Sequence, residues 1–182
     1  IRGAGEIASA VAHRLTGAGC RVALQSSRPP IAIRRLMAFS DAYFHGEAEL
    51  EGLRARRLDD PHGVAAAWAA GVVPLLAADF GRSLAARSWA VLVDARMNKQ
   101  LAPEPQVGLA RLVVGMGPGC RAGHNVDVAV ETSWDALGRV VRQGETMPLA
   151  GEPRAVLGQA RSRFRYAPAT GVLRALAEIG QR

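Results

Sequence analysis

The chain has 182 residues and a formal net charge of +7; 49% of its residues are hydrophobic and 5% are aromatic. This length predicts one main domain with a small appendage, and the composition supports a largely aliphatic core. No apolar run reaches the roughly 20 residues that a membrane-spanning helix needs. Lys99 is the single lysine, so arginine carries nearly all of the positive charge, but the arginines are scattered and are not interleaved with aromatic residues. We therefore expect neither a membrane nor a nucleic acid as partner.

The chain contains two cysteines, Cys20 and Cys120. They provide no disulfide framework, and no set of His, Cys, Asp and Glu residues has the spacing of a metal site. The sequence therefore predicts a cytoplasmic protein without a metal site. Cys120 follows a glycine-rich turn whose N–H groups would favour a thiolate, although a small buried cysteine is the commoner case.

A glycine-rich pattern opens the chain, because Gly3, Gly5 and Ala8 form a G-x-G-x-x-A sequence. The first glycine allows a tight turn, the second allows a phosphate to approach the backbone, and the small third residue allows close helix packing. A helix is expected at about Glu6–Ala18, and its free N–H groups and dipole favour an anion at its start. The strand that normally precedes this motif is missing, so we expect the chain to be a piece of a longer protein. The predicted phosphate contacts are Gly3, Ala4, Gly5 and Glu6.

A short strand is expected at Arg21–Leu24, completing the opening that is typical of a doubly wound sheet. In dinucleotide-binding folds the end of this strand carries an acidic residue for the ribose hydroxyls. Gln25 occupies that place here, which weakens the prediction of NAD as ligand. Arg28 could hold a phosphate instead, or it could simply be solvated, as exposed arginines usually are.

The middle of the chain alternates between predicted helices and strands, as expected for a parallel sheet. Asp59-Asp60-Pro61 is a typical helix start. Asp79 and Asp94 follow apolar strands, so both carboxylates are expected where the strands end. Asp94 is interpreted either as a partner of a ribose or pterin N–H or as a cap for the next segment. The expected segments are short helical pieces at 31–46, a strand or hairpin at 47–58, helices at 59–70 and 83–88, and strands at 72–77 and 89–93.

A second glycine-rich turn follows a strand expected at Leu112–Val114. Ligands of open α/β sheets bind outside the carboxyl ends of the strands, so both glycine turns are expected along one edge of the sheet. The second turn is interpreted either as a ligand-facing loop, stiffened by its proline, or as a simple turn at the end of a strand. Its residues are Gly115, Gly117, Pro118 and Gly119.

From His124 onward apolar and polar residues alternate, which predicts a strand. Its two carboxylates could accept hydrogen bonds from the donor-rich edge of a pterin, or they could face solvent on an edge strand. A further strand is expected at 137–142. The apolar face of the strand from His124 is predicted to carry Val126, Val128 and Val130, and the polar face Asn125, Asp127 and Glu131.

These features together predict an α/β fold in two parts. Residues 1–148 are expected to form a Rossmann-like, doubly wound and mostly parallel sheet that binds a cofactor. Residues 149–182 are expected to form an incomplete small β module, because they are too few for a core of their own.

Five sequence blocks and a tail, taken in chain order, resemble a known family. The blocks are I-R-G-A-G-E-I-A-S-A-V-A-H-R-L (1–15), R-P-P-I-A-I-R-R-L-M-A-F-S-D-A (28–42), V-D-A-R-M-N-K (93–99), L-V-V-G-M-G-P-G-C-R-A-G-H-N-V-D-V-A-V-E-T (112–132) and L-G-R-V-V-R-Q-G (137–144), and the tail is Y-A-P-A-T-G-V-L (166–173). The chain resembles the accessory proteins of molybdenum hydroxylases, the XdhC/CoxI-like group, and within it the branch of the selenium-dependent molybdenum hydroxylase system (YqeB-like). The tail resembles the start of a lipoyl-like half-barrel.

The resemblance implies a bacterial maturation protein that binds the molybdenum cofactor, as molybdopterin or its dinucleotide form, and delivers it to a hydroxylase apoenzyme. It implies binding and transfer without a catalytic residue. The phosphate would lie on the first glycine turn, and the second turn and the strand with Asp127 would frame the remainder. Three residues depart from the family pattern: Gln25, Gln100 and Cys120.

Two other functions stay open at this point. The first is an NAD(P)-dependent oxidoreductase, which uses the same fold for a different chemistry. The second is an interaction scaffold with a vestigial Rossmann pocket. The oligomeric state, a homodimer included, is also open.

Overall fold

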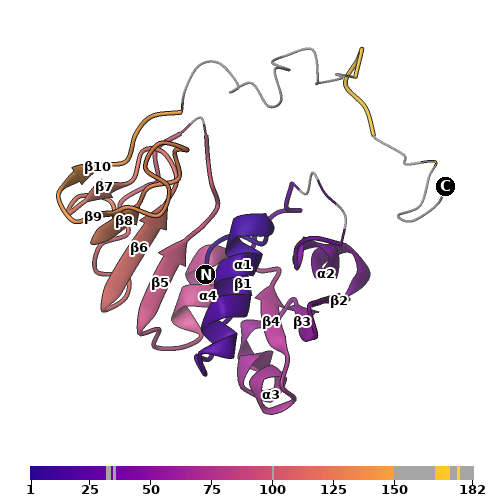
Figure 1. Ribbon diagram of the computed structural model, residues 1–182. Coiled ribbons are helices and arrows are strands. Elements are labelled where there is room, and N and C mark those ends of the chain that lie inside the picture. Colours follow the sequence, from indigo (N-terminus) through magenta and orange to yellow (C-terminus); the bar gives the residue numbers. More distant parts are fainter. Residues whose placement is uncertain (32–33, 35, 100, 150–166, 173–175, 177–182) are drawn as a thin grey trace. The chain divides into compact units, whose positions relative to one another are not determined.

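A computed structural model describes residues 1–31, 34, 36–99, 101–149, 167–172 and 176 (Figure 1). The chain divides into two compact units, Ile1–Pro148 and Leu149–Arg182. The predicted lipoyl-like module at 149–182 lies mostly outside the described residues, as does Gln100. All of the helices and strands named below belong to the first unit.

Strands and short helices alternate along the first unit, so the protein is of mixed α/β class, as the sequence predicts (Figure 1). In the described part of the chain the helices are α1 (Glu6–Gly17), α2 (Ser40–His45), α3 (Val64–Ala69) and α4 (Phe80–Ala85), with a 3-10 turn, η1 (Pro61–Gly63), before α3. The strands are β1 (Leu24–Gln25), β2 (Glu47–Leu50), β3 (Leu53–Leu58), β4 (Val73–Leu76), β5 (Val91–Asp94), β6 (Leu112–Met116), β7 (Arg121–Ala122), β8 (Val128–Val130), β9 (Val140–Val141) and β10 (Gly144–Glu145).

Eight of the strands form two groups of four, ordered β1-β4-β3-β2 and β5-β6-β8-β9. The outermost pair of each group is antiparallel, β2 with β3 and β8 with β9, whereas the inner pairs are parallel. β7 and β10 form a separate antiparallel pair. The sheet is therefore mostly parallel, with an antiparallel strand at each outer side.

The first three residues join the two groups of strands. Arg2 forms parallel bridges to Gln25 at the end of β1 and to Asp94 at the end of β5. Its N–H donates to the backbone of β5 at 2.7 Å, and the N–H of Gly3 donates to Gln25 O at 2.8 Å. The start of the chain thus takes the central place in the strand order, between β1 and β5.

Helices cover both faces of this sheet. α1 and α2 pack on one face, where Ala8 and Ala12 of α1 are fully buried and their small side chains allow the helix to lie close to the strands. α3 and α4 contribute to the opposite face, where Val64 is buried. Neighbouring residues of β4 show the two sides, because Leu75 belongs to the first core and Leu76 to the other.

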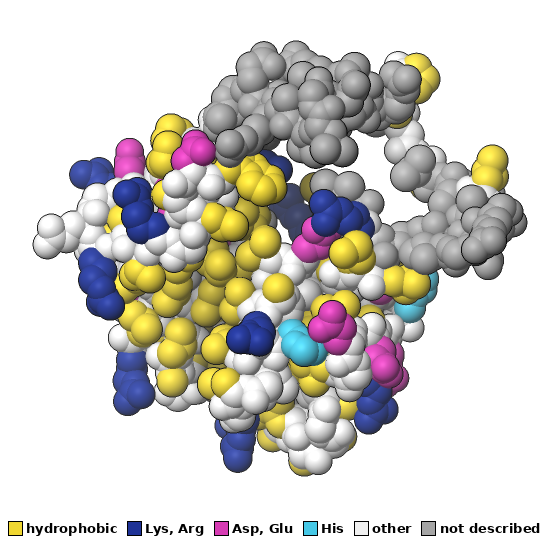
Figure 2. All heavy atoms as spheres, in the orientation of Figure 1, with side chains coloured by type: hydrophobic (Ala, Val, Ile, Leu, Met, Phe, Trp, Pro, Cys, Tyr) yellow, Lys and Arg dark blue, Asp and Glu magenta, His cyan; other side chains and the backbone are white. Residues whose placement is uncertain are grey.

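The group of strands β5-β6-β8-β9 is fully packed on only one face in the described part of the chain. Val113 and Ala129 point into a buried cluster on the side of α4. The alternating residues are covered only in part. Val93 is buried in the first core and Val114 and Met116 pack against it, whereas Val91, Leu112 and Val140 are 47%, 38% and 53% exposed. Figure 2 shows hydrophobic side chains gathered over β5 and β6, beside α1.

The strand predicted from His124 onward is shorter than expected. β8 has three residues, and Val126 before it is fully buried in the same cluster as Ala129, so it does not share a face with Val128 and Val130. The prediction of one alternating strand is wrong because residues 121–126 form a tight turn, in which the N–H groups of His124 and Asn125 both reach Arg121 O.

Two other elements differ from the sequence prediction. α4 begins at Phe80, earlier than expected, because the Asp79 side chain accepts the N–H of Arg82 and caps the helix. The strand expected at 137–142 contains only β9, and the pairing of β7 with β10 was not predicted. Such two-residue strands carry too little hydrophobic periodicity to be recognised.

Candidate functional site

The carboxyl ends of the parallel strands meet along one edge of the sheet, which we call the carboxyl edge. Arg2 lies beside Asp94, and Asp94 pairs in turn with Gly115 of β6. The segments that follow these strands therefore leave the sheet on the same side. Both predicted glycine turns lie on the carboxyl edge, as the sequence predicts.

The first glycine turn, residues 3–5, leads directly into α1. Gly3 has φ +111°, and a Cβ added to it would lie 2.9 Å from Ala95 O, so glycine is required there. Gly5 is the N-cap of α1, with φ −76°, and an added Cβ would meet no atom within 4 Å. Among the described residues, the N–H groups of Ala4 and Gly5 have no acceptor, and Ser9 makes the first helical bond, to Gly5 O. Together with the first-turn N–H groups of α1, they form a cluster of donors suited to an anion.

The other predicted contacts near this turn are placed differently. Glu6, within α1, pairs with Arg34 at 3.1 Å. Arg28 is exposed, and its guanidinium contacts no described partner. Gln25 is buried, and its amide donates to Ser27 Oγ and Ala78 O, each at 2.9 Å. Gln25 thus ties the end of β1 to the segment after β4, and its donors are already used within the protein.

The second glycine turn, residues 117–119, packs against the loop that follows β5. Cβ atoms added at Gly117 and Gly119, which have φ +101° and +75°, would lie 3.1 Å from Met97 Sδ and 3.0 Å from Ala102 Cα. Pro118 between them is half-buried. Because Ala95 of the same loop contacts Gly3, this loop occupies space between the two glycine turns. The hollow predicted between them is therefore partly filled.

Gly115 does not belong to the exposed part of this turn. It is buried within β6, and an added Cβ would lie 2.7 Å from both Cys120 Sγ and Val126 Cγ1. The absence of a side chain at Gly115 leaves room for Cys120 and Val126 in the core. Burial raises the pKa of the Cys120 thiol to about 11, so this cysteine is neutral at physiological pH and packs as a small hydrophobic residue.

Two buried polar residues fix the second glycine turn, and sequence reasoning did not assign them that role. Thr146 Oγ1 donates to Gly117 O at 2.7 Å and accepts the N–H of Cys120 at 3.1 Å. Asn125 Nδ2 donates to Gly119 O at 2.9 Å. Turn geometry brings these residues together across the β7–β10 pairing, which no sequence motif reveals.

Asp94 lies at the centre of a polar cluster that we call the edge network. Its Oδ1 accepts from Arg96 Nε at 2.9 Å, and its Oδ2 accepts from Arg96 Nη2 at 2.5 Å and from Gln106 Nε2 at 2.7 Å. Although burial opposes its ionisation, these hydrogen bonds hold its pKa below the usual range. The predicted role as a ligand contact is thus secondary to a structural one. The edge network consists of Arg2, Asp94, Arg96, Glu104 and Gln106.

Asp127 and Glu131 do not line one cleft wall, which corrects the prediction of a shared face. Asp127 precedes β8, and its Oδ2 accepts the N–H of Val113 near the start of β6. Glu131 follows β8 at its other end and is 1% exposed. Its carboxylate accepts the backbone N–H groups of Thr132, Ser133 and Met147 at 2.6–2.8 Å. With β8 only three residues long, the strand separates the two carboxylates rather than aligning them.

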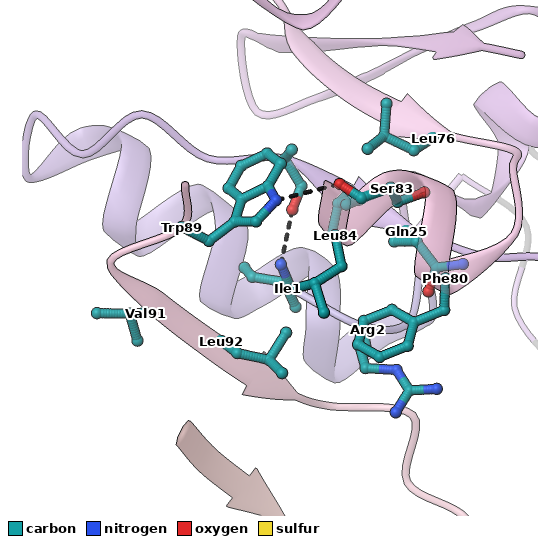
Figure 3. Close-up of a pocket in the computed structure, with 12 residues that line it drawn as sticks. Ile1, Arg2, Gln25, Leu76, Phe80, Ser83, Leu84, Trp89, Val91 and Leu92 are labelled. Atoms are coloured by element: carbon teal, nitrogen blue, oxygen red, sulfur yellow. Dashed lines mark hydrogen bonds between the residues drawn. The ribbon is translucent and has the colours of Figure 1, made fainter. Parts of the chain in front are cut away.

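A small apolar hollow lies between the sheet and α4 (Figure 3). Its lining includes Leu92 and Trp89, and the Phe80 ring stacks 3.7 Å from the Arg2 guanidinium carbon. Its volume is about 30 Å³, whereas pockets for drug-sized ligands measure roughly 300–1,000 Å³. This hollow is therefore too small for such a ligand, although Arg2 and Gln25, which also line it, adjoin Gly3 of the first glycine turn.

The described residues contain no cluster of three or more His, Cys, Asp and Glu side chains that could hold a metal ion. Within the same part of the chain, no helix combines the length and apolar character that crossing a bilayer requires.

Fold and site together define a mixed α/β protein with a mostly parallel sheet and a glycine turn that follows residues 1–3, the segment between β1 and β5. In sequence, the chain is similar to the uncharacterized protein YqeB of Escherichia coli (strain K12), with 32% identity over 183 residues that cover 99% of this chain and 33% of that protein. The chain thus spans about a third of that relative's length. This similarity links the chain to the YqeB-like group. No family model and no solved structure matches the chain.

Proposed function

We propose that the chain is the Rossmann-like, cofactor-binding part of a cytoplasmic maturation protein for a molybdenum hydroxylase. It binds the molybdenum cofactor, or a related phosphate-bearing nucleotide cofactor, and passes it to the apoenzyme. The bound cofactor would supply the phosphate that anchors it and the molybdenum that is delivered. The chain itself supplies binding groups and needs no catalytic residue.

The first glycine turn carries this proposal. It follows residues 1–3, which bridge to β1 on one side and to β5 on the other, at the place in the strand order where open α/β sheets bind ligands. Ala4 and Gly5 offer N–H groups without acceptors among the described residues, and Gly5 leaves open space. These donors would hold the phosphate, together with the start of α1.

An NAD(P)-dependent oxidoreductase is the second candidate, because the same donors suit a pyrophosphate. Exposed Arg28, just after β1, lies where a 2′-phosphate of NADP is commonly bound. The absence of an acid at Gln25, whose amide donors are used internally, speaks against NAD. The sequence resemblance to the accessory proteins of molybdenum hydroxylases leads us to favour the molybdenum cofactor as ligand over NADP.

Replacing Gly5 with tryptophan is expected to abolish binding of the isolated molybdenum cofactor while the protein stays folded. The indole would cover the free N–H groups, and the extended backbone and open space at Gly5 accept a side chain without strain. Binding is measured by fluorescence titration of the whole chain. Gly17→Trp at the opposite end of α1 is the matched control, because its added Cβ also meets no atom within 4 Å.

The titration, together with an assay of hydroxylase maturation in cells, separates the three candidate functions. Loss of cofactor binding in Gly5→Trp, with binding retained in Gly17→Trp, supports the proposal. Saturable binding of NADPH without any binding of the molybdenum cofactor would favour the oxidoreductase. A Gly5→Trp protein that still supports hydroxylase maturation in cells would favour the scaffold.

A further inference from the structure

Two arginines of the edge network converge on one carboxylate beside the first glycine turn. Arg2 Nη1 donates to Glu104 Oε1 at 2.5 Å, and Arg96 Nη2 donates to Glu104 Oε2 at 2.8 Å. Arg2 directly precedes Gly3, and the backbone nitrogen of Arg96 lies 3.2 Å from the position of a Cβ added to Gly3. The backbones of both arginines thus adjoin the first glycine turn at the carboxyl edge, and Glu104 links their side chains.

Other residues hold the two arginine side chains in place, whereas the Glu104 side chain is exposed to solvent. The side chain of Arg2 is 8% exposed and that of Arg96 is 31% exposed, but that of Glu104 is 51% exposed. Arg2 Nη1 also donates to Gln106 Oε1 at 2.9 Å, and Arg96 Nε donates to Asp94 Oδ1. Both guanidinium groups would therefore keep their positions if Glu104 moved away.

The charges and hydrogen-bonding atoms favour an anion at this place. With Glu104 in contact, the two arginines are balanced by two carboxylates; without it, one positive charge is in excess. Arg2 Nε is buried and has no partner among the described residues. Although burial opposes ionisation, the hydrogen bonds from Arg96 and Arg2 lower the pKa of Glu104 to about 2, so the carboxylate stays charged at physiological pH. Two oxygens of one carboxylate bridging two arginines is also the geometry of a bound phosphate.

We propose that Arg2 and Arg96 form an anion subsite beside the first glycine turn, and that Glu104 fills it until a phosphate of the ligand displaces the carboxylate. This inference rests on the proposed function and adds its regulation. Glu104 competes with the ligand, so the apparent affinity is lowered by the fraction of molecules in which the subsite is filled. The competition would let the protein hold its cofactor firmly enough to protect it and still release it.

Glu104→Gln is expected to tighten binding of inorganic pyrophosphate by about tenfold, a typical coupling between competing groups. Glutamine keeps the shape of the side chain but removes the competing charge. Glu104→Asp, which is too short to bridge both arginines, should give a smaller gain. Affinities of the full chain are measured by calorimetry at low salt, and thermal unfolding establishes that each variant folds.

Glu145→Gln is the matched control, because it removes the same charge from an exposed residue of β10. It should change the affinity by no more than about twofold. Adding Arg96→Gln to Glu104→Gln should cancel the gain. Equal effects of Glu104→Gln and Glu145→Gln, or a gain that survives Arg96→Gln, would overturn the subsite. If the subsite were overturned but Gly5→Trp abolished cofactor binding, the proposed function would stand without the subsite. If Glu104→Gln gave its gain while Gly5→Trp bound the cofactor normally, the subsite would stand and the proposed function would fail.

Discussion

Asp94→Ala is expected to lower the free energy of unfolding by about 3 kcal/mol, near the lower end of the range for breaking a buried ion pair. The substitution removes all acceptors of Arg96 Nε and of the fully buried Gln106 amide. The loss stays near the lower end because Arg96 keeps its contact with Glu104. Denaturant unfolding followed by circular dichroism measures the change.

Asp59→Ala provides the matched control for Asp94→Ala. Asp59 accepts from the Nε and Nη2 of Arg57, an arginine two residues away, as Asp94 does from Arg96. Its side chain is 72% exposed, whereas that of Asp94 is 4% exposed. An exposed pair of this kind contributes below about 1 kcal/mol. Equal losses in the two variants would show that the edge network is not a buried structural element.

Glu131→Ala is expected to lower the free energy of unfolding by about 3 kcal/mol, because three backbone N–H groups lose their acceptor and part of that cost is relieved by water. The carboxylate joins the segment after β8 to Met147, whose N–H it accepts at 2.6 Å. An exposed residue, Glu145 of β10, offers the control: Glu145→Ala should change stability by less than about 0.5 kcal/mol.

The contribution of Glu131 also predicts a pH dependence. Burial opposes ionisation, but the N–H groups of Met147, Ser133 and Thr132 outweigh it and lower the pKa of Glu131 in the folded protein. The unfolded chain therefore takes up the proton first on acidification, from about pH 4.3. The stabilisation is complete above that value and is lost as the pH falls through the folded pKa. Between pH 6 and pH 3, the free energy of unfolding should fall more steeply for the natural chain than for Glu131→Gln. Equal dependence of the two free energies on pH would contradict this.

The first glycine turn could be predicted from sequence because its constraints are local. A positive φ at Gly3, a helix start at Gly5 and small residues facing the sheet are each visible within a few positions. The same reasoning located the second turn but misjudged Gly115. A glycine needed for close packing and one needed for a turn look the same in sequence.

The edge network could not be predicted, because its members come together only through the central position of residues 1–3. Arg2 and Glu104 are 102 positions apart, and each alone is an ordinary charged residue. Asp94 was recognised at the right edge of the sheet, yet its partners were not. Glu131 was similarly assigned to a strand face, whereas a short strand and a following turn make it an acceptor for backbone N–H groups.

Backbone amide NMR during titration with the isolated molybdenum cofactor tests the central claim most directly. The account predicts saturable shifts of the Ala4, Gly5 and Glu6 amide signals, with weaker changes in α1 beyond its first turn. It also predicts that the signals of Gly17 and Gly71, at the opposite edge of the sheet, stay in place. Shifts confined to residues away from the first glycine turn, or none at saturating cofactor, would contradict the account.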